Sequence, residues 1–489
     1  MEPAKSLSAY LETDGERWPD VGVRRLTGRE AISDLFAFTV DVAVPADRDL
    51  AERAYPGATV TIVLERDGFE VRRIHSMVKT VADRFEDTGD YHTYQLKVVP
   101  HAFQLSLVQT QEVYLDVTIP EVMKQKLELH GLGADEFELR LTATYPKREI
   151  VVQYGESDLD FIRRLAEHVG ISFFFEHGGT TDKWVFTDHV DGFGTIEGVE
   201  EVHFHSRGEA LGVFALGVTT DLVPGTFFVQ DYNYRAPLLD PTGEFAADPD
   251  APGGIVEYGS HVKTPEEAKW LAKIRGEERL TRKVLYDAKS SIAALAAGKA
   301  TKVLDHPRLE GGRRLLLLEV EHHAAFPLFG EAGADDASYR NTFHAIPAEV
   351  LHRPVRSTPK PRMPGVVTGI IQPGPGGEVG GVAKLTEDGR YTVQLHFDTA
   401  QHGQQKASHP VRMAQPFAGH GNGMHFPLLP GTEVILAFAN GDPDRPVIVG
   451  ALPNPISPAA IVADEAHTHR IRTSQGVTIQ FGQTVPGRK

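Results

Sequence analysis

The sequence predicts a mainly β protein, in which a large α+β region precedes a small all-β barrel. Three observations predict this class. Short runs of β-branched and aromatic residues recur along the chain, only a few segments have helical periodicity, and a proline-rich stretch separates two regions of different character. A chain of 489 residues is long enough for about three or four domains.

Strands are predicted in short runs that are rich in β-branched and aromatic residues. The clearest runs are residues 58–65, 171–176, 391–398, 433–438 and 447–452. In the third run Tyr391, Val393 and Leu395 share one face at period two, which is typical of a half-buried antiparallel sheet. The Asn-Gly-Asp-Pro sequence at 440–443 predicts a turn between the last two runs.

Helices are predicted over residues 119–130, 157–169 and from 264 through 274. Ser157 is the expected N-cap of the second helix, with Asp160 three residues on, and Gly170 is the expected stop. Thr264 opens the third helix before Pro265 in the same manner. Each helix has an apolar stripe, and its simplest interpretation is packing against a sheet.

Four prolines in residues 354–364 favour an extended connector, because proline donates no backbone hydrogen bond to a β ladder. The expected organisation is therefore an α+β region at 1–353, the linker at 354–364, and a five-stranded barrel of the OB type at 365–458. Residues 459–489 are too few for another globular domain.

Charge and cysteine content exclude several functions. Lys and Arg total 50 and Asp and Glu total 67, which gives a formal net charge of −17, so nucleic acid is not expected as a partner. No cysteine is present, so disulfides, thiolate metal sites and cysteine nucleophiles are excluded. The first residues do not form a secretory signal, and no apolar run is long enough to span a membrane, so we expect synthesis in the cytoplasm.

Several motifs in a fixed order resemble one family. They are residues 156–165 (ESDLDFIRRL), 170–177 (GISFFFEH) and 231–237 (DYNYRAP), followed in the barrel by 387–398, 411–419, 421–423, 427–434 and 441–446. The chain resembles the VgrG spike proteins of the type VI secretion system, which are related to the hub and central spike of contractile phage tails. The positions that carry the resemblance in the barrel are Asp388, Gly389, Arg390, Gly419, Gly423, Pro427, Gly431, Glu433, Gly441, Asp442 and Pro443.

The resemblance implies a structural homotrimer rather than an enzyme. Its first region would contain two barrel domains per chain, so that the trimer presents a pseudo-sixfold base to an Hcp-like hexameric tail-tube protein. The OB barrels would form a neck, and residues 459–489 would start a triangular β-prism that carries a PAAR-type tip protein. Effector or baseplate proteins are further expected partners. The spike would assemble in the cytoplasm, be secreted through the contractile apparatus, and contact the target membrane mechanically.

One segment departs from the family pattern. Members carry Asn-Glu before an apolar-x-Phe-Asp-Asp stretch at the start of the prism, whereas residues 476–482 here are Gly-Val-Thr-Ile-Gln-Phe-Gly. A strand rises about 3.3 Å per residue, so the few residues that follow cannot form a long needle. A shortened chain and a needle supplied by another chain are both open alternatives.

Histidines raise two metal hypotheses, although we predict no metal or cofactor. His467 and His469 would face the same side of a strand, so that three chains would surround one axial ion, and this alternative stays open. The second group is spread more widely than zinc ligands usually are, and we interpret it as polar surface; it consists of His402, His409, His420 and His425.

Three rival functions remain. The first is the spike of an extracellular contractile injection particle or of a phage tail, which the sequence does not separate from type VI secretion. The second is a cell-wall hydrolase hub, although no nucleophile elbow and no His-Glu-x-x-His motif is present. The third is an oligosaccharide-binding barrel, which requires exposed aromatics on one barrel face, whereas Tyr391, Phe397 and Phe438 fit inward positions.

Overall fold

The computed structural model describes residues 7–48, 50, 53–84, 90–206, 210–327, 337–399 and 408–481. The chain divides into two compact units. The first consists of Met1–Val108, Ile119–Pro146 and Ser157–Pro359, and the second of Gln109–Thr118, Lys147–Glu156 and Lys360–Lys489. The chain therefore passes between the units five times. The domain limits expected from the sequence stay a prediction.

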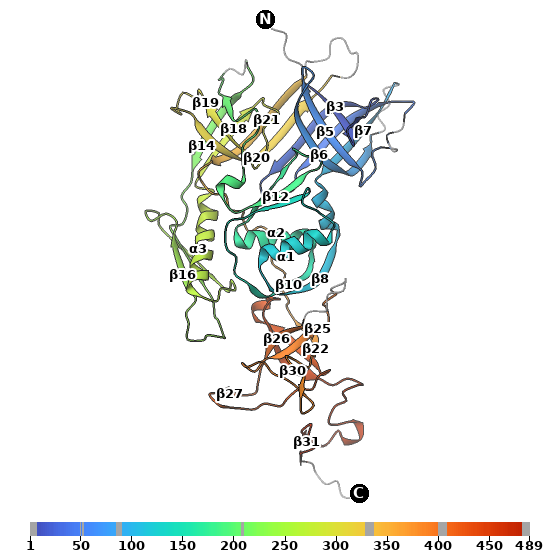
Figure 1. Ribbon diagram of the computed structural model, residues 1–489, viewed down its shortest axis with the longest axis vertical. Coiled ribbons are helices and arrows are strands. Elements are labelled where there is room, and N and C mark those ends of the chain that lie inside the picture. Colours follow the sequence, from blue (N-terminus) through green and yellow to red (C-terminus); the bar gives the residue numbers. More distant parts are fainter. Residues whose placement is uncertain are drawn as a thin grey trace. The chain divides into compact units, whose positions relative to one another are not determined.

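A 13-stranded sheet dominates the first unit, and its N-terminal half forms one lobe (Figure 1). The strand order in this lobe is β3-β4-β7-β6-β5-β1-β2, and β1 also contacts β3, so the lobe curls back on itself. Its strands are β1 (Leu7–Thr13), β2 (Glu16–Arg17), β3 (Gly22–Ala31), β4 (Ala37–Pro45), β5 (Thr59–Arg66), β6 (Phe69–Asp83) and β7 (Tyr91–Val99).

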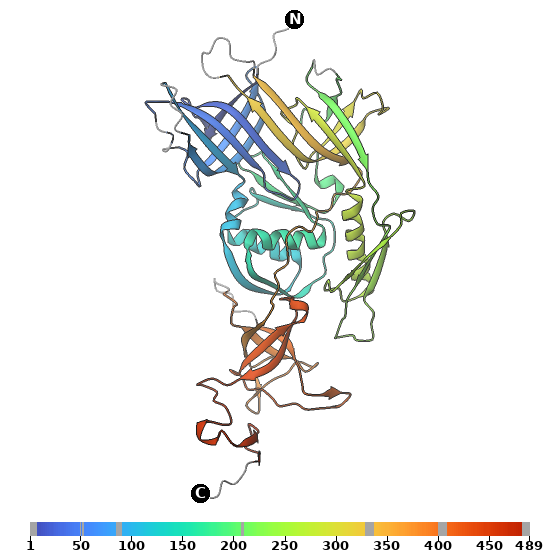
Figure 2. The ribbon, with the colours of Figure 1, turned by 180° about the vertical axis from the view of Figure 1, so that it is seen from behind.

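The second half of the sheet forms a second lobe beside the first (Figures 1 and 2). Its strands follow the order β14-β18-β21-β20-β19-β13, and a bridge between Phe204 and Val213 returns the path to β14. The strands are β13 (Glu201–His203), β14 (Val213–Thr220), β18 (Val284–Ser290), β19 (Ala300–Leu304), β20 (Arg313–Ala325) and β21 (Ser338–Pro347). The expected pair of barrel domains corresponds to these two lobes of one continuous sheet, and among the described residues the closed barrel lies in the second unit.

Pairing of β20 with β3 joins the two lobes, and a buried ionic cluster lies beside this seam. Arg72 on β6 donates to Glu30 of β3 at 2.7 Å and to the Leu295 carbonyl of the second lobe at 2.6 Å. His322 on β20 lies 2.9 Å from the same Glu30 oxygen. Burial alone would raise the pKa of Glu30, but Arg72 and His322 lower it to about 2. The carboxylate therefore stays charged and holds groups from both lobes together.

A helical insert completes the middle of the first unit. Helices α1 (Ile119–Leu129) and α2 (Asp158–Val169) pack together, and η1 (His101–Leu107) contacts α2. The adjoining sheet has the order β11-β12-β9, made of β11 (Ser172–Glu176), β12 (Lys183–Thr187) and β9 (Phe137–Arg140). The predicted cap is confirmed, because the Asp160 N–H donates to Ser157 Oγ at 3.1 Å. Gly170 ends α2 with φ 73°, which favours glycine.

The predicted third helix is α3 (Pro265–Leu280), capped by Thr264. It packs against β15 and β16 of a small sheet of order β16-β15-β17, in which β15 (Thr226–Gln230) is central. The outer strands are β16 (Thr242–Ala246) and β17 (Gly254–Tyr258). A short 3-10 helix, η2 (Val190–Gly192), follows β12. Among the described residues, no helix combines the length and apolar character needed to cross a bilayer.

The second unit contains the expected five-stranded closed barrel. Its strand order is β22-β25-β26-β30-β29, and β29 pairs back with β22. The strands are β22 (Val366–Ile371), β25 (Tyr391–Leu395), β26 (Ser408–Met413), β29 (Glu433–Phe438) and β30 (Pro446–Leu452). Tyr391, Val434 and Leu436 are buried in its core, as the alternation predicts. The mainly β class with a small OB-type barrel is therefore confirmed.

Shorter elements complete the second unit. A two-stranded ribbon is formed by β8 (Gln109–Val117) and β10 (Arg148–Ser157), and three small hairpins are formed by β23 (Glu378–Val379) with β24 (Val382–Ala383), β27 (Ala418–Gly419) with β28 (Asn422–Gly423), and β31 (His469–Arg472) with β32 (Thr478–Phe481). Two 3-10 helices, η3 (Ala439–Gly441) and η4 (Ala463–Glu465), lie before β30 and β31. Residues 482–489 of the expected prism start lie outside the described part of the chain.

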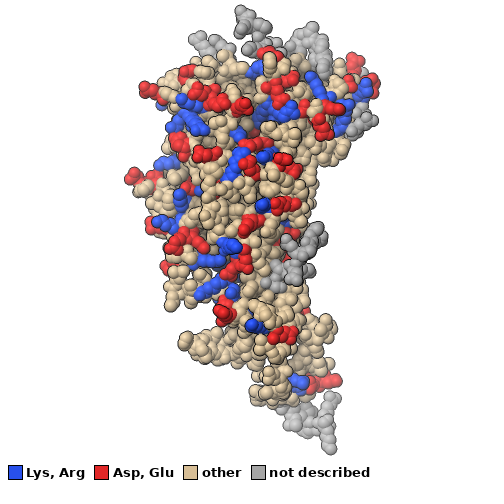
Figure 3. Space-filling model, viewed as in Figure 1, with Lys and Arg blue, Asp and Glu red and all other residues tan. Residues whose placement is uncertain are grey.

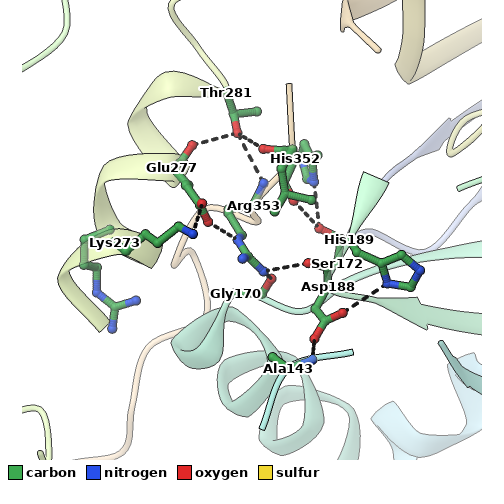
Figure 4. A network of polar contacts seen from close by, with 12 residues as sticks. Ala143, Gly170, Ser172, Asp188, His189, Lys273, Glu277, Thr281, His352 and Arg353 are labelled. Atoms are coloured by element: carbon green, nitrogen blue, oxygen red, sulfur yellow. Dashed lines mark hydrogen bonds and ion pairs between the residues drawn. The ribbon is translucent and has the colours of Figure 1, made fainter. Parts of the chain in front are cut away.

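A polar network fixes the end of the first unit just before the linker (Figure 4). Arg353 donates from Nη1 to the Gly170 carbonyl at 2.8 Å and to the Asp188 carbonyl at 3.3 Å. Its Nε donates to Glu277 of α3 at 2.8 Å. One guanidinium thus connects the end of α2, the end of β12 and α3. Next to it, buried His352 places Nδ1 at 2.8 Å from Ser172 Oγ.

This network predicts an acid-sensitive contribution from His352. Burial, together with the positive charge of Arg353, lowers the pKa of His352 to about 3. The unfolded chain, in which the ordinary value is 6.5, therefore takes up the proton first, and stability falls as pH drops below that value. Below that value, each pH unit lowers the free energy of unfolding by ~1.4 kcal/mol. We expect the His352→Gln variant to lose about 2 kcal/mol less stability than the parent between pH 7 and pH 5.

Urea unfolding followed by tryptophan fluorescence measures this difference. Trp18, Trp184 and Trp270 are the only tryptophans of the sequence and all belong to the first unit, so the signal reports that unit. The exposed His420→Gln serves as control and keeps the parent's pH dependence. Other titrating groups are shared by both proteins and cancel in the comparison. Equal pH dependence of His352→Gln and the parent would contradict the assignment.

Candidate functional site

The predicted site residues all lie in the second unit, and the first group forms a turn before β25. Gly389 has φ 78°, a conformation that favours glycine. The Arg390 side chain donates to Asp388 Oδ1 at 2.9 Å, and its Nη1 lies 3.6 Å from Glu149 Oε2 on β10. Burial alone would raise the pKa of Asp388, but the hydrogen bonds from Thr386 and Arg390, together with the Arg390 charge, lower it. The turn therefore connects the barrel to the ribbon.

The glycine loop forms an exposed hairpin, β27 and β28. Across it Gly419 pairs with Asn422 and Gly423 pairs with Ala418. A Cβ on Gly419 would lie 2.8 Å from Asn422 Oδ1, and one on Gly423 would lie 3.0 Å from the Phe417 carbonyl oxygen. The flanking apolar side chains are exposed to solvent: Phe417 by 55%, Met424 by 43% and Phe426 by 47%. Such a group of exposed apolar side chains is typical of an interaction surface.

The third group lies where β29 begins. Pro427 is exposed, and the next residue, Leu428, donates its backbone N–H to the Tyr391 hydroxyl at 3.0 Å. Gly431 turns the chain with φ 84° and donates to the Ile371 carbonyl at 2.8 Å. Glu433 starts β29, is partly buried, and accepts from Asn454 at 3.1 Å. These contacts hold the segment before β29 against strands β22 and β25 of the barrel.

The fourth group, Gly441 to Pro443, forms a charged anchor with Lys360. The Lys360 ammonium lies 2.5 Å from Asp442 and 2.7 Å from Asp444. The Gly441 carbonyl accepts from the Met363 N–H at 2.8 Å. The anchor therefore holds the start of the barrel segment, which the sequence placed in a linker. The motif at 441–446 includes Asp444, but sequence reasoning missed its contact with Lys360, because nothing local links residue 360 to residues 442–444.

Sequence reasoning also missed the ribbon of β8 and β10, which belongs to the barrel unit. Val113, Ile150 and Val152 join the buried cluster of the barrel core. The Val152 N–H donates to Asp444 at 2.7 Å, and the Thr399 N–H donates to the Gln111 carbonyl at 2.8 Å. Two segments distant in sequence are thus part of the barrel's packing.

The C-terminal hairpin is amphipathic. The pairs His469–Phe481 and Ile471–Ile479 lie on one face, and the pairs Arg470–Gln480 and Arg472–Thr478 lie on the other. On the first face Ile471, Ile479 and Phe481 are 46%, 49% and 62% exposed. Figure 3 shows few charged side chains on the visible face of the second unit, whereas both signs of charge cover the first unit.

The histidine hypotheses meet different outcomes. His467 lies in a turn before β31, so it does not form the predicted same-face pair with His469 on one strand. That geometric premise was wrong, because η4 and its turn precede the strand. Of the second group, His402 lies outside the described residues, His409 is buried in β26, and His420 is exposed. His425 stacks on Tyr391 with ring centroids 6.2 Å apart. The interpretation as polar surface is therefore wrong for His409.

The ribbon predicts that the barrel stays bound after its linker is cut. A specific protease site inserted between Pro359 and Lys360 would separate the backbone of the barrel segment from the rest of the chain. We expect both fragments to elute together in size-exclusion chromatography, because Val113, Ile150 and Val152 remain in the barrel core. Val152→Asp buries a charge at a cost of several kcal/mol and releases the fragment.

Val379→Asp is the matched control, because Val379 is 59% exposed on the same unit. Its cleaved fragments stay together. Separation of the parent's fragments under native conditions would show that the ribbon does not hold the barrel.

Comparisons with known proteins match both units. The family model for the phage tail baseplate hub (GPD) matches residues 29–327. The model for the type VI secretion system/phage-baseplate injector OB domain matches residues 378–452. In fold, the chain is similar to the E. coli c3393 protein, with a TM-score of 0.64, 24% identity, and coverage of 90% of this chain and 99% of that one.

A chain of the Francisella PdpA-VgrG complex has a TM-score of 0.65 at 8% identity, over 99% of this chain and 76% of that one.

Curated relatives are type VI secretion system spike proteins. VgrG4b of Pseudomonas aeruginosa is 31% identical, over 92% of this chain and 57% of that protein. VgrG3 of Vibrio cholerae is 29% identical, over 91% of this chain and 44% of that protein. The chain thus spans about half the length of these relatives. It belongs to the phage tail baseplate hub family, and its relatives within that family are VgrG spike proteins.

Proposed function

We propose that the chain is the structural hub and spike base of a contractile injection machine of the type VI secretion class. It acts as a homotrimer that joins an Hcp-like hexameric tail-tube protein to a PAAR-type, membrane-puncturing tip. The names of the relatives, the hub family model and the OB-domain model support this proposal. The role is mechanical, so stiffness rather than chemistry is what the fold supplies.

The amphipathic hairpin of β31 and β32 is the main observation that supports the proposed trimer. An isolated two-stranded hairpin is marginally stable at best in water, and this one exposes Ile471, Ile479 and Phe481. Three hairpins around a common axis turn these apolar faces toward one another, while Arg470 and Gln480 stay outside. The exposed side chains beside β27 and β28 add a second apolar surface for the same contacts.

The two lobes of the first unit support the tube contact. Each chain has two strand lobes in one continuous sheet, so three chains present six lobes. A ring of six lobes has the symmetry that a hexameric tube protein requires. The trimer would assemble in the cytoplasm, leave through the contractile apparatus and contact the target membrane mechanically. Effector and baseplate proteins are further proposed partners.

Two rivals remain as alternatives. The spike of an extracellular injection particle or a phage tail would use the same fold, but the curated relatives are type VI spikes. A cell-wall hydrolase hub would clear peptidoglycan in a zymogram, and we expect no clearing. One relative is named an actin cross-linking toxin, and the chain covers 41% of that protein. We propose a structural role for the part of the protein that the structure describes.

The trimer predicts a solution mass three times that of one chain, measured by light scattering after size-exclusion chromatography. Ile479→Asp places a charge on the apolar face, and we expect it to shift the mass toward a single chain. Its matched control is Thr478→Asp on the opposite face of the same exposed strand, which keeps the parent's mass. A parent that elutes with the mass of one chain would overturn the trimer.

A further inference from the structure

The sheet of β15, β16 and β17 carries an acidic segment that the proposed function does not use. Residues 221–262, which we call the acidic segment, contain seven acidic residues and one basic residue, Arg235. The acidic residues are Asp221, Asp231, Asp240, Glu244, Asp248, Asp250 and Glu257. The segment belongs wholly to the first unit, so its surface can be described within that unit.

On one face of this sheet, α3 packs against β15 and β16 (Figure 2). Val229 is buried in a cluster with Ala268 and Leu271 of the helix. Gly243 approaches so closely that a Cβ there would lie 2.0 Å from the Lys269 backbone N. Glu257 is also engaged, because Arg275 of α3 lies 2.8 Å from its carboxylate. The helix therefore occupies this face over β15 and β16.

The opposite face is apolar and exposed. The register aligns Phe228, Glu244 and Val256 in one row across the three strands. Val256 is 69% exposed and Tyr258, two residues on, is 60% exposed. Glu244 is exposed beside them and makes no ion pair with any residue that the structure describes. Apolar side chains and an uncompensated negative charge therefore share this face.

The outer edge of β17 is an edge of the sheet. Among the described residues, β17 pairs with β15 alone. The Gly259 N–H donates to the Gln230 carbonyl at 3.0 Å, and the Gly253 carbonyl accepts from the Thr226 N–H at 3.3 Å. In a parallel pair, the residues that bond to the neighbour alternate with residues whose N–H and C=O point away. Val256 and Tyr258 are therefore the residues that direct their backbone groups outward.

We propose that the β17 edge binds an extended, positively charged segment of another protein as an added strand. Main-chain hydrogen bonds to Val256 and Tyr258 would supply affinity. The row of Phe228, Glu244 and Val256 would select alternating apolar and basic side chains. Charge argues for this occupant over a second copy of the chain, because the whole chain carries −17 and the acidic segment is acidic too. The proposal does not depend on the trimer.

The probe is a fluorescein-labelled ten-residue peptide of alternating lysine and valine, titrated with the full chain and followed by fluorescence anisotropy. We expect saturable binding that weakens at higher salt, because the contact is partly ionic. A peptide of alternating glutamate and valine does not bind. The lysine–valine peptide with N-methyl groups on alternate residues keeps its charge but cannot pair along an edge, and it loses at least about tenfold in affinity.

Two variants locate the binding. Val256→Pro removes an outward N–H and leaves the hydrogen bonds to β15, so we expect loss of peptide binding with unchanged thermal unfolding. Glu244→Lys combined with Asp250→Lys alters exposed side chains alone and weakens binding about tenfold. Glu16→Lys combined with Glu310→Lys is the control with the same change in charge elsewhere on the first unit, and it binds as the parent does.

Three outcomes would overturn the proposal. The first is binding of the N-methylated peptide as tight as that of the parent peptide, which would mean plain charge attraction. The second is unchanged binding by the Glu244→Lys, Asp250→Lys variant, which stands even where Val256→Pro fails to fold. The third is a change in the solution mass of the chain itself in this variant, which would assign the edge to contacts between copies.

Discussion

Pairing between β3 and β20 is the interaction on which the first unit depends. It converts two curled lobes into one sheet, and the buried cluster of Arg72, Glu30 and His322 ties side chains from both lobes across it. A backbone seam of this kind resists sliding, because register shifts would move apolar residues to the wrong face. The relation of one lobe to the other is therefore set by hydrogen bonds rather than by a flexible connector.

The barrel unit is also held together by contacts between segments that are distant in sequence. Its core is completed by β8 and β10, which arrive from earlier in the chain, and its charged anchor joins Lys360 to the turn at Asp442 and Asp444. A barrel assembled from three separate segments is connected to the rest of the chain at several points. That connectivity suits a protein whose proposed task is to carry force.

Strongly shifted titratable groups in this chain have structural causes. His352 is kept neutral by burial beside Arg353, and Glu30 is kept charged by an arginine and a histidine. Perturbed pKa values cluster at catalytic sites, but buried ion-pair networks perturb them equally well. These groups connect strands, helices and lobes, and the contacts described for them are all within the protein. The proposed function accordingly rests on exposed surfaces: the apolar face of β31 and β32, and the edge of β17.

Local sequence determined the ends and buried faces of several elements. Ser157 and Gly170 predicted both ends of α2, because caps and left-handed stops act on neighbouring residues. Alternation predicted β29 to the residue, since an inward–outward period needs no distant partner. The strand expected to reach Asp398 ends at Leu395, where the Asp398 N–H turns back to the Leu395 carbonyl. The motif residues were predicted as turns and strand entries, and their role as family positions stays a prediction.

Tertiary structure alone decided which distant segments meet. The pattern of β10 shows that Ile150 and Val152 face a core, but not that this core belongs to the barrel. Likewise, the sequence around Lys360 shows a charged residue in a linker, and its contact with Asp442 arises when the chain folds. His467 lies in a turn before β31 and not on a strand with His469. Periodicity records which side chains are to be buried, whereas the surface that buries them depends on how the whole chain packs, and that information is spread over residues far apart in sequence.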